Sequence, residues 1–428
     1  MPRLPAHGQA PRLGMAAILR RQFEMIDNQP LIGELIGRID HDPTDATALY
    51  DISLIRLAAG FVAEALELQR QAVEVQRDFR IVHGTGQGLK LLAFVTPGDF
   101  MANTPVDFLL VASDVELWLH YVDAETADLA DLPEHDVALV AVAESPANAP
   151  VLARLKDLLA DWSGPILNNR PEVIAGLTRD GVAATLADVP SILAPKTVRV
   201  ARAGLEHVAV GQGDLPSIAE GIDFPAIIRP IGTHAGGGME RIGDRTELAA
   251  YLTEQPGEAL FLAPFIDYRG ADGLYTKHRI VLIDGRPYPS HMALSEHWMV
   301  HYLSAGMMEN AEKRAVEERW MADFDVDFAR RHDAAFAALH AKVGLDYFGI
   351  DSAETVDGRL IVFELDVAMV VHDMDSAEIY PYKKPAMRRL FDAFLAMLAQ
   401  RAAGRPGAVA VVGAVGEGEA GSRLLEAH

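Results

Sequence analysis

The sequence predicts an α/β protein with a helical module at its N-terminal end, and three patterns point to this. Apolar residues recur at helical spacing from about residue 15 to residue 82. Short apolar runs then alternate with helical stretches, a texture typical of parallel sheets. From residue 196 onward, longer strand-like runs are separated by Asp-Gly turns. A chain of 428 residues is long enough for two or three such domains.

The composition excludes several classes of function. The chain has 38 basic and 61 acidic residues, a net charge of −23, and no long basic run, so we expect neither nucleic acid nor a membrane as a partner. It has no cysteine, which excludes disulfides, thiolate nucleophiles and cysteine-ligated metals. The first 15 residues lack the apolar segment of a signal peptide, and no apolar run approaches the roughly 20 residues of a membrane span. A cytoplasmic protein is therefore expected.

The first module, residues 15–86, is predicted to contain a pair of adjacent helices. One helix opens after the segment 42–46, and the second follows Gly60. This stretch resembles a tetratricopeptide repeat, although one copy is visible where a stable array needs about three. The alternative is a helical pair that packs on the main body or on a second subunit, as in a homodimer.

The remaining chain divides into a small parallel α/β domain at 87–195, a larger domain at 196–403 and a tail at 404–428. A crossover helix is expected over 149–162, with Pro150 in its first turn. A last amphipathic helix is expected over about 385–399. The tail is rich in Gly, Ala and Val and is expected to be flexible. The four strands expected in the α/β domain are the apolar runs at 91–95, 106–111, 137–142 and 164–167.

The most informative segment is a hairpin that carries three acids. If Asp357 and Gly358 form a two-residue turn, Asp351 lies directly opposite Glu364. Asp366 is two residues further along its strand and shares the same face. Three carboxylates this close repel one another, and a hard divalent cation with oxygen ligands would neutralise them. The alternative is three solvated acids on an exposed strand.

A second informative segment is an apolar strand with a basic residue that leads into a glycine-rich loop. The strand carries Arg229, and successive glycines would let backbone N–H groups approach phosphate oxygens. The loop matches neither the P-loop nor the dinucleotide fingerprint, so taken alone it is also typical of a surface turn. The glycines concerned are Gly232, Gly236, Gly237 and Gly238.

Taken in order over residues 167–366, these segments resemble the ATP-grasp superfamily, in the branch of glutathione synthetases and ribosomal-protein glutamate ligases. The resemblance implies a pre-grasp α/β domain followed by a two-lobed ATP-grasp domain. It implies that Arg229 and the glycines cover the nucleotide phosphates, and that the linker Phe265, Ile266 and Asp267 holds adenine and ribose. It further implies that Arg279, assisted by Lys277, contacts the reacting phosphate, and that Asp351, Glu364 and Asp366 bind the metal.

The activity implied by this resemblance is that of an ADP-forming ligase that makes a carbon–nitrogen bond. The cofactors would be ATP and Mg²⁺ or Mn²⁺, and the substrates a small-molecule or peptide carboxylate and an amine, joined through an acyl phosphate. Three positions depart from the family pattern: Arg229 replaces a lysine, Gly181 replaces a lysine after Asp180, and Asp366 replaces an asparagine. The alternative is a nucleotide-binding scaffold, or degenerate ATP-grasp protein, that recruits a protein partner through its N-terminal helices. A kinase or phosphotransferase on the same fold is a third hypothesis.

A histidine-rich segment at 291–301 remains open at this level. Counting from the turn at 284–285 pairs His291 with His278, which places both on the face opposite Arg279. His297 and His301 are four residues apart, so a transition-metal site and a wall of the substrate pocket are both compatible with the spacing.

Overall fold

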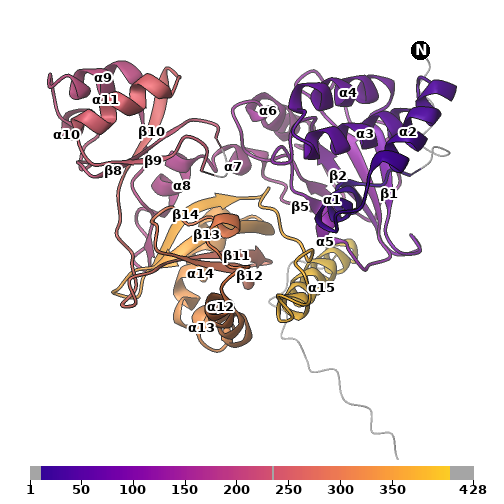
Figure 1. The fold of residues 1–428 in the computed structure, drawn as a ribbon. Helices are drawn as coiled ribbons and strands as arrows, with labels where there is room; N and C mark the ends of the chain where they lie inside the picture. The colour runs from indigo at the N-terminus through magenta and orange to yellow at the C-terminus, as the bar shows by residue number, and fades with distance from the viewer. Residues whose placement is uncertain (1–10, 234–235, 405–428) are drawn as a thin grey trace, which may run out of the picture.

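The computed structural model describes residues 11–233 and 236–404, and the predicted tail lies almost wholly outside this part of the chain. Figure 1 shows the described chain as three lobes, each built around its own sheet. The predicted α/β class with a helical N-terminal module is confirmed. Within the described ranges, no helix is long and apolar enough to cross a membrane.

The N-terminal module consists of four helices, of which α3 is its core. Asp45 begins α3, where its carboxylate accepts a hydrogen bond from the Ala48 N–H at 2.9 Å, a typical helix N-cap. Most residues of α3 are buried, because α2 and α4 pack on it from two sides and α1 from a third. The helices are α1 (Met15–Phe23), α2 (Gln29–His41), α3 (Ala46–Ala58) and α4 (Val62–Val75).

The module packs on a five-stranded sheet of order β1-β3-β2-β4-β5, in which only β1 runs antiparallel. Three expectations are wrong here. Residues 78–82 form strand β1 rather than helix, because Phe79 and Ile81 alternate into the core. Residues 106–109 form helix α5 rather than a strand, since a short run buried on every side has no periodicity to separate the two. Strand β3 was not predicted. The elements are β1 (Asp78–Val82), β2 (Lys90–Val95), α5 (Val106–Leu109), β3 (Glu116–Tyr121), β4 (Val137–Val140), α6 (Ala149–Leu158) and β5 (Ile166–Leu167).

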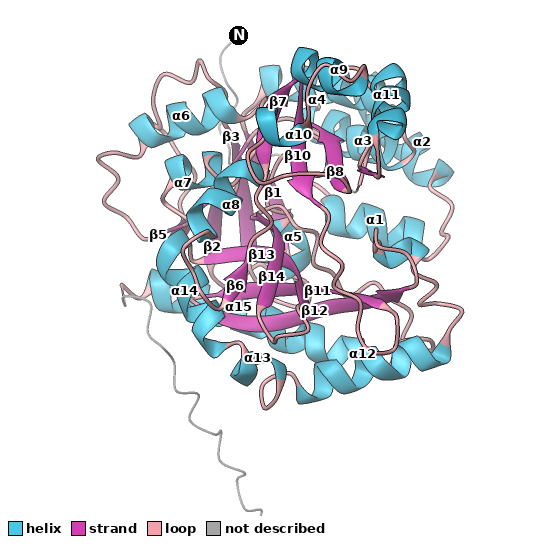
Figure 2. Cartoon of the chain, turned by 90° about the vertical axis from the view of Figure 1, so that its left-hand side faces the viewer, coloured by secondary structure: helices cyan, strands magenta, loops and turns pink. Residues whose placement is uncertain are grey.

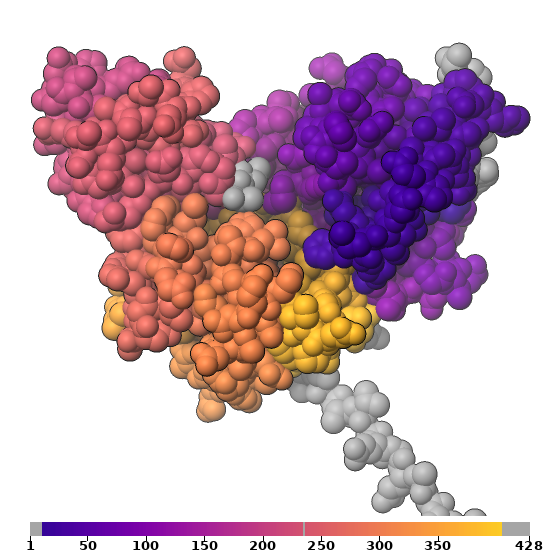
Figure 3. All heavy atoms as spheres, viewed as in Figure 1, coloured from indigo at the N-terminus to yellow at the C-terminus, as the bar shows by residue number. Residues whose placement is uncertain are grey.

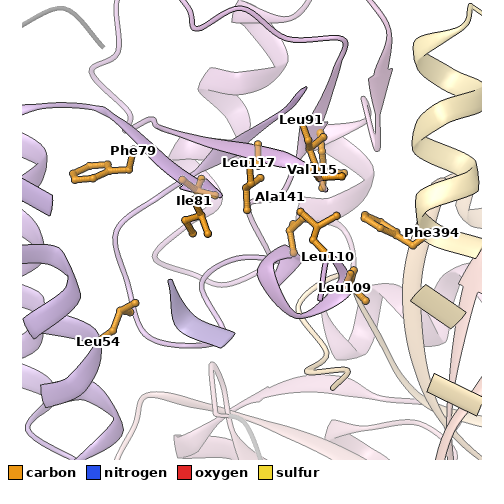
Figure 4. Close-up of a cluster of buried hydrophobic side chains, with 14 of the residues drawn as sticks. Leu54, Phe79, Ile81, Leu91, Leu109, Leu110, Val115, Leu117, Ala141 and Phe394 are labelled. Atoms are coloured by element: carbon orange, nitrogen blue, oxygen red, sulfur yellow. The ribbon is translucent and has the colours of Figure 1, made fainter. Parts of the chain in front are cut away.

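One hydrophobic core joins the helical module, this sheet and the last helix of the chain. Figure 4 shows Leu54 of α3 facing Phe79 and Ile81 of β1, with Phe394 of α15 approaching from the other side. Apolar burial on this scale is the main source of cohesion between the segments, at about 25 cal/mol per Å². The sequence ends of the described chain are therefore packed together through one core.

The small lobe is a four-stranded antiparallel sheet of order β7-β10-β8-β9, with helices packed on it at the upper left of Figure 1. Its core is separate from the other clusters and is formed by aliphatic residues and Tyr251. Helices α7 and α8 and the short strand β6 lead into it. The elements are α7 (Pro171–Ala175), α8 (Arg179–Leu186), β6 (Ile192–Leu193), β7 (Val198–Ala201), α9 (Arg202–Ala209), α10 (Leu215–Ile218), β8 (Ala226–Pro230), β9 (Glu240–Ile242), α11 (Arg245–Glu254) and β10 (Ala259–Pro264).

The large lobe contains the sheet β12-β11-β13-β14-β6, in which β11 to β14 pair antiparallel. In Figures 1 and 2, α12 and α13 lie below this sheet, so its other face is turned toward the small lobe and the α/β domain. The elements are β11 (Tyr275–Ile283), β12 (Arg286–Ser295), η1 (Tyr302–Ser304), α12 (Ala311–Asp323), α13 (Phe328–Arg331), α14 (Asp333–Val343), β13 (Tyr347–Glu354), β14 (Leu360–Asp366) and α15 (Lys383–Ala402).

The two predicted hairpin turns differ. Asp284 and Gly285 form the expected two-residue turn, and both have positive φ values, 51° and 78°. The second hairpin has a three-residue loop, because Glu354 pairs with Leu360 and the Thr355 N–H then donates to the Arg359 carbonyl at 3.0 Å. A β-bulge at Phe363 then shifts the register back by one residue.

A buried histidine on the lower face of this sheet predicts acid sensitivity. His278 is 4% exposed and its ring lies 5.0 Å from that of Trp320 and 4.7 Å from that of Phe328. Burial lowers the pKa of His278 from 6.5 to about 4. The unfolded chain therefore binds a proton as the pH falls below 6.5 and the folded chain does not, so stability is lost in this window.

We expect this histidine alone to lower the free energy of unfolding by about 2 kcal/mol between neutral pH and about pH 5. Urea unfolding at several pH values measures it. A His278→Leu variant should lose this part of the pH dependence, whereas the same change at the exposed His207 on α9 should not. Equal pH dependence in all three proteins would show that His278 is not the group concerned.

Candidate active site

A cavity of about 250 Å³ lies where the small lobe, the large lobe and the α/β domain meet. Figure 3 shows the surface notched between the small lobe and the α/β domain. Charged side chains from all three parts reach its wall: Glu144 from the α/β domain, Arg179 from α8, Arg199 and Arg229 from the small lobe, and Glu364 and Asp366 from β14.

Three arginines make the upper wall of this cavity strongly basic. Arg229 is only 8% exposed, and burial together with the nearby Arg179 lowers the pKa of its guanidinium to about 10. Arg199 lies over the ring of Phe261 at 5.2 Å and pairs with Asp180 at 2.8 Å. Guanidinium groups clustered in this way suit the bidentate binding of phosphate.

Two of these arginines were missed by the sequence analysis. A lysine was sought immediately after Asp180, but the cation stands one residue before it, at Arg179. The Thr178 hydroxyl accepts from the Gly181 N–H and begins α8, so Arg179 is the first residue of the helix. The only pattern in the sequence that could have indicated Arg179 was a Thr N-cap followed by arginine. Arg199 gave none, because its position depends on the pairing of β7 with β10.

The glycine-rich loop lies partly at this cavity. Gly232 is in the wall and adopts a φ of 75°, which favours glycine. The Arg229 guanidinium donates to the Thr233 hydroxyl at 3.1 Å, so the strand and loop are tied together. Gly238 must be glycine, because its φ is 63° and a Cβ there would approach Pro230 to 2.9 Å. Gly236, Gly237 and Gly238 are not among the residues that line the cavity, and their contact with phosphate stays a prediction.

The predicted adenine and ribose linker also stays a prediction. Phe265, Ile266 and Asp267 follow β10 but are not among the residues that line the cavity. The Asp267 carboxylate pairs with Arg269 at 2.5 Å, and the Phe265 ring lies 4.7 Å from the Arg241 guanidinium.

Four polar side chains form one row across the large sheet. His291 pairs with Arg279, Arg279 with Asp351, and Asp351 with Glu364, on the neighbouring strands β12, β11, β13 and β14. Residues paired directly across strands share a face and lie about 5 Å apart. The row therefore crosses the upper face of the sheet, and its Glu364 end reaches the cavity.

Asp351 is the centre of charge in this row. Its carboxylate accepts hydrogen bonds from Arg279 at 2.8 and 3.1 Å and from Lys277 at 2.9 Å. Burial alone would raise the pKa of Asp351, but the charges of Arg279 and Lys277 outweigh burial and hold it well below its usual range. The predicted placement of Lys277 and Arg279 on one face is confirmed.

Two of the three carboxylates predicted to bind a metal ion are paired with basic side chains. The pairing of Asp351 with Glu364 is confirmed, but Asp351 is neutralised by its two cations and Glu364 contacts Arg179 at 2.6 Å. Across residues 11–233 and 236–404, no group of three or more acidic or histidine side chains is arranged to hold a metal ion.

Glu364 and Asp366 nevertheless fit a magnesium ion that also binds phosphate. Both line the cavity, and burial followed by the charge of Glu364 raises the pKa of Asp366 to about 7. A cation would relieve this excess of buried negative charge. Mg²⁺ in nucleotide sites usually takes one or two protein carboxylates and completes its shell with phosphate oxygens and water. The assignment of Asp351, Glu364 and Asp366 as ligands stays a prediction.

Two other departures concern residues near the row. The predicted pairing of His291 with His278 is wrong, because a bulge at Ser290 shifts the register and places His291 opposite Arg279. Glu144, which follows β4, was missed. Its pKa is raised by burial, against the opposing charges of Arg199 and Arg179, so the α/β domain adds a carboxylate to the cavity wall.

The chain is similar to several known proteins. No family model matches the chain. A segment of 100 residues is 32% identical to part of the carbamoyl phosphate synthase large chain of Renibacterium salmoninarum. The matched segment makes up 23% of this chain and 8% of that protein.

Among solved structures, an ATP-grasp RimK domain protein of Sphaerobacter thermophilus is 14% identical, with a TM-score of 0.38 over 73% of this chain and 99% of that one. The D-alanine–D-alanine ligase of Bacillus anthracis in complex with ATP is 12% identical, with a TM-score of 0.42 over 74% of this chain and 97% of that one. These structural neighbours are ATP-grasp proteins.

Proposed function

We propose that the chain is an Mg-ATP-dependent carboxylate–amine ligase of the ATP-grasp type. The observation that carries the proposal is the cavity in which three arginines face Glu364 and Asp366, at one end of a row that continues to Asp351 and Arg279. A nucleoside triphosphate needs cations and a metal ion at its phosphates, and here the arginines would supply the cations while Glu364 and Asp366 would hold the metal.

The chain's own residues then have distinct roles. Arg179, Arg199 and Arg229 bind the phosphates, and Arg229 also ties its strand to the loop above them. Arg279 contacts the transferred phosphoryl group, because it is the first cation of the row beyond the cavity, on the strand after Asp351. Asp351 fixes the orientation of the Arg279 guanidinium through two hydrogen bonds.

The reaction needs positioning and charge neutralisation more than a nucleophilic side chain, in keeping with a chain that has no cysteine. A bound Mg²⁺, held by Glu364 and Asp366, would neutralise charge on the phosphates. The substrate carboxylate becomes an acyl phosphate, which an amine then displaces. Preorganised cations such as Arg279 stabilise the charge that develops on phosphate oxygens.

The test is incubation of the purified chain with Mg-ATP and pooled amino acids and small carboxylates, with ADP and phosphate measured for each pool. We expect release with at least one pool and a matching amide product. Tight ATP binding without release under any pool would contradict the ligase proposal and favour the nucleotide-binding scaffold. Phosphate transfer to a stable product without an amide would favour the kinase hypothesis.

A further inference from the structure

The two ends of the row formed by His291, Arg279, Asp351 and Glu364 have different surroundings. At the Glu364 end lies the cavity with the three arginines, and the residues that line it include none from β11 or β12. His291 stands at the other end, two strands beyond Asp351, and Arg279 lies between them. Because the nucleotide phosphates occupy the Glu364 side, the second substrate has to approach Arg279 from the His291 side.

The imidazole of His291 is not hydrogen-bonded to any other described side chain. In the described part of the chain its ring has no hydrogen-bond partner, and the residue is partly exposed. Its one aromatic neighbour is Tyr302, at 4.7 Å between ring centroids. The Tyr302 hydroxyl is held by Glu317 at 3.1 Å, and Glu317 also accepts from the Met292 N–H at 2.9 Å. The neighbouring Tyr302 is therefore held in place, while the nitrogens of the His291 ring remain available to a substrate.

We propose that His291 accepts the proton from the attacking amine, and this inference rests on the ligase function proposed above. The amine nitrogen, entering as the free base, forms a bond to the carbonyl carbon of the acyl phosphate. Phosphate leaves with the electron pair of the broken C–O bond. One proton moves from nitrogen to a ring nitrogen of His291, which returns it to the departing phosphate, so the histidine ends unchanged.

The basicity of His291 depends on the charges around it. Arg279 and Lys277 face it from β11, Asp351 from β13 and Lys383 from α15. Burial and then Arg279 lower the pKa of His291 well below its usual value, so the imidazole of the free enzyme is neutral but only weakly basic. An acyl phosphate bound at Arg279 brings negative charge beside these cations and raises the basicity of the ring when it is needed.

Lys383 is itself a buried and paired cation. It is 3% exposed, pairs with Asp375 at 2.9 Å and with Glu317 at 3.6 Å, and stands 4.0 Å from the centroid of the Tyr302 ring. The same network that fixes Tyr302 against His291 thus also places a positive charge nearby. His291, on β12, is therefore surrounded by residues of the loop after β12 and of helix α15.

The test compares two nucleophiles in the full-length chain, with Mg-ATP and the pooled carboxylates. Hydroxylamine is largely unprotonated at neutral pH and captures an acyl phosphate as a hydroxamate without a protein base, whereas an amino-acid amine needs one. In His291→Gln and His291→Asn, we expect amide formation to fall about 100-fold and hydroxamate formation to stay within about twofold of wild type.

The control is His301→Gln. This residue also faces Lys277 and Arg279 but lies outside the row, and we expect it to leave the ratio of the two products unchanged. Equal loss of both products in the His291 variants, no loss of either, or a selective loss in His301→Gln would overturn the role of His291. None of these results would affect the ligase proposal. If wild type forms neither product, the ligase proposal fails and the inference fails with it.

Discussion

Replacing Arg279 with lysine is expected to lower substrate-dependent ADP release about 100-fold or more while leaving the chain folded. Lysine keeps a positive charge beside Asp351 but loses the two parallel hydrogen bonds, at 2.8 and 3.1 Å, that orient the guanidinium. The transferred phosphoryl group would then lose an oriented donor in the transition state. Steady-state rates at saturating ATP measure this effect.

The apolar variant Arg279→Met separates catalysis from stability. It leaves the buried Asp351 with Lys277 as its one remaining cation, and we expect the free energy of unfolding to fall by about 3 kcal/mol. If Arg279→Lys retained full activity, Arg279 would be a structural partner of Asp351 and not a contact of the phosphate. The pair of variants therefore distinguishes the two roles of one side chain.

The sequence could predict the centre of the site because strand pairing depends on local rules. Asp351 was placed opposite Glu364 by assuming a two-residue loop and regular pairing. Both assumptions are wrong. The loop has three residues, and the bulge at Phe363 adds one residue to the other strand, so the two deviations cancel at Asp351. For β11 and β12 the predicted turn is correct, but the sequence does not reveal the bulge at Ser290. His291 was therefore predicted on the wrong face of the sheet.

The arginines of the cavity could not be predicted for a different reason. Arg179 and Arg199 are 20 residues apart in the sequence; Arg179 lies on α8, which packs against β14, and Arg199 on β7 of the small lobe. Their approach depends on how the small lobe is seated above β14, which no local pattern encodes. The helix at 106–109 was wrongly predicted as a strand, because so short an apolar run shows no periodicity. The long helix α15 repeats its amphipathic pattern over several turns and was predicted nearly to its ends.

The departures from the family pattern are consistent with an altered site that keeps its charges. A lysine is replaced by Arg229, which remains a buried cation at the cavity, and the lysine missing at Gly181 is matched by Arg179 nearby. Asp366 in place of asparagine adds negative charge to the same wall, which also carries three arginines. We infer that the exchanges at these positions balance one another.

Replacing Glu364 with glutamine is expected to abolish turnover, with a loss of at least about 100-fold. The amide keeps one oxygen but removes the charge that Mg²⁺ would require, and it also removes the pairing with Arg179 at 2.6 Å. The Mg²⁺ concentration for half-maximal ADP release should rise. Binding of metal-free ATP should persist or tighten, because one negative charge leaves a phosphate site.

Two controls make this prediction specific to the metal. Glu354→Gln, on the neighbouring strand β13, changes a carboxylate that pairs with Arg331 and His332 away from the cavity, and should leave the Mg²⁺ dependence unchanged. Asp366→Asn keeps an oxygen ligand, as in the family pattern, and should retain most activity. Full activity with normal Mg²⁺ dependence in Glu364→Gln would exclude the hairpin as the metal site, and the three arginines would then have to bind the phosphates without it.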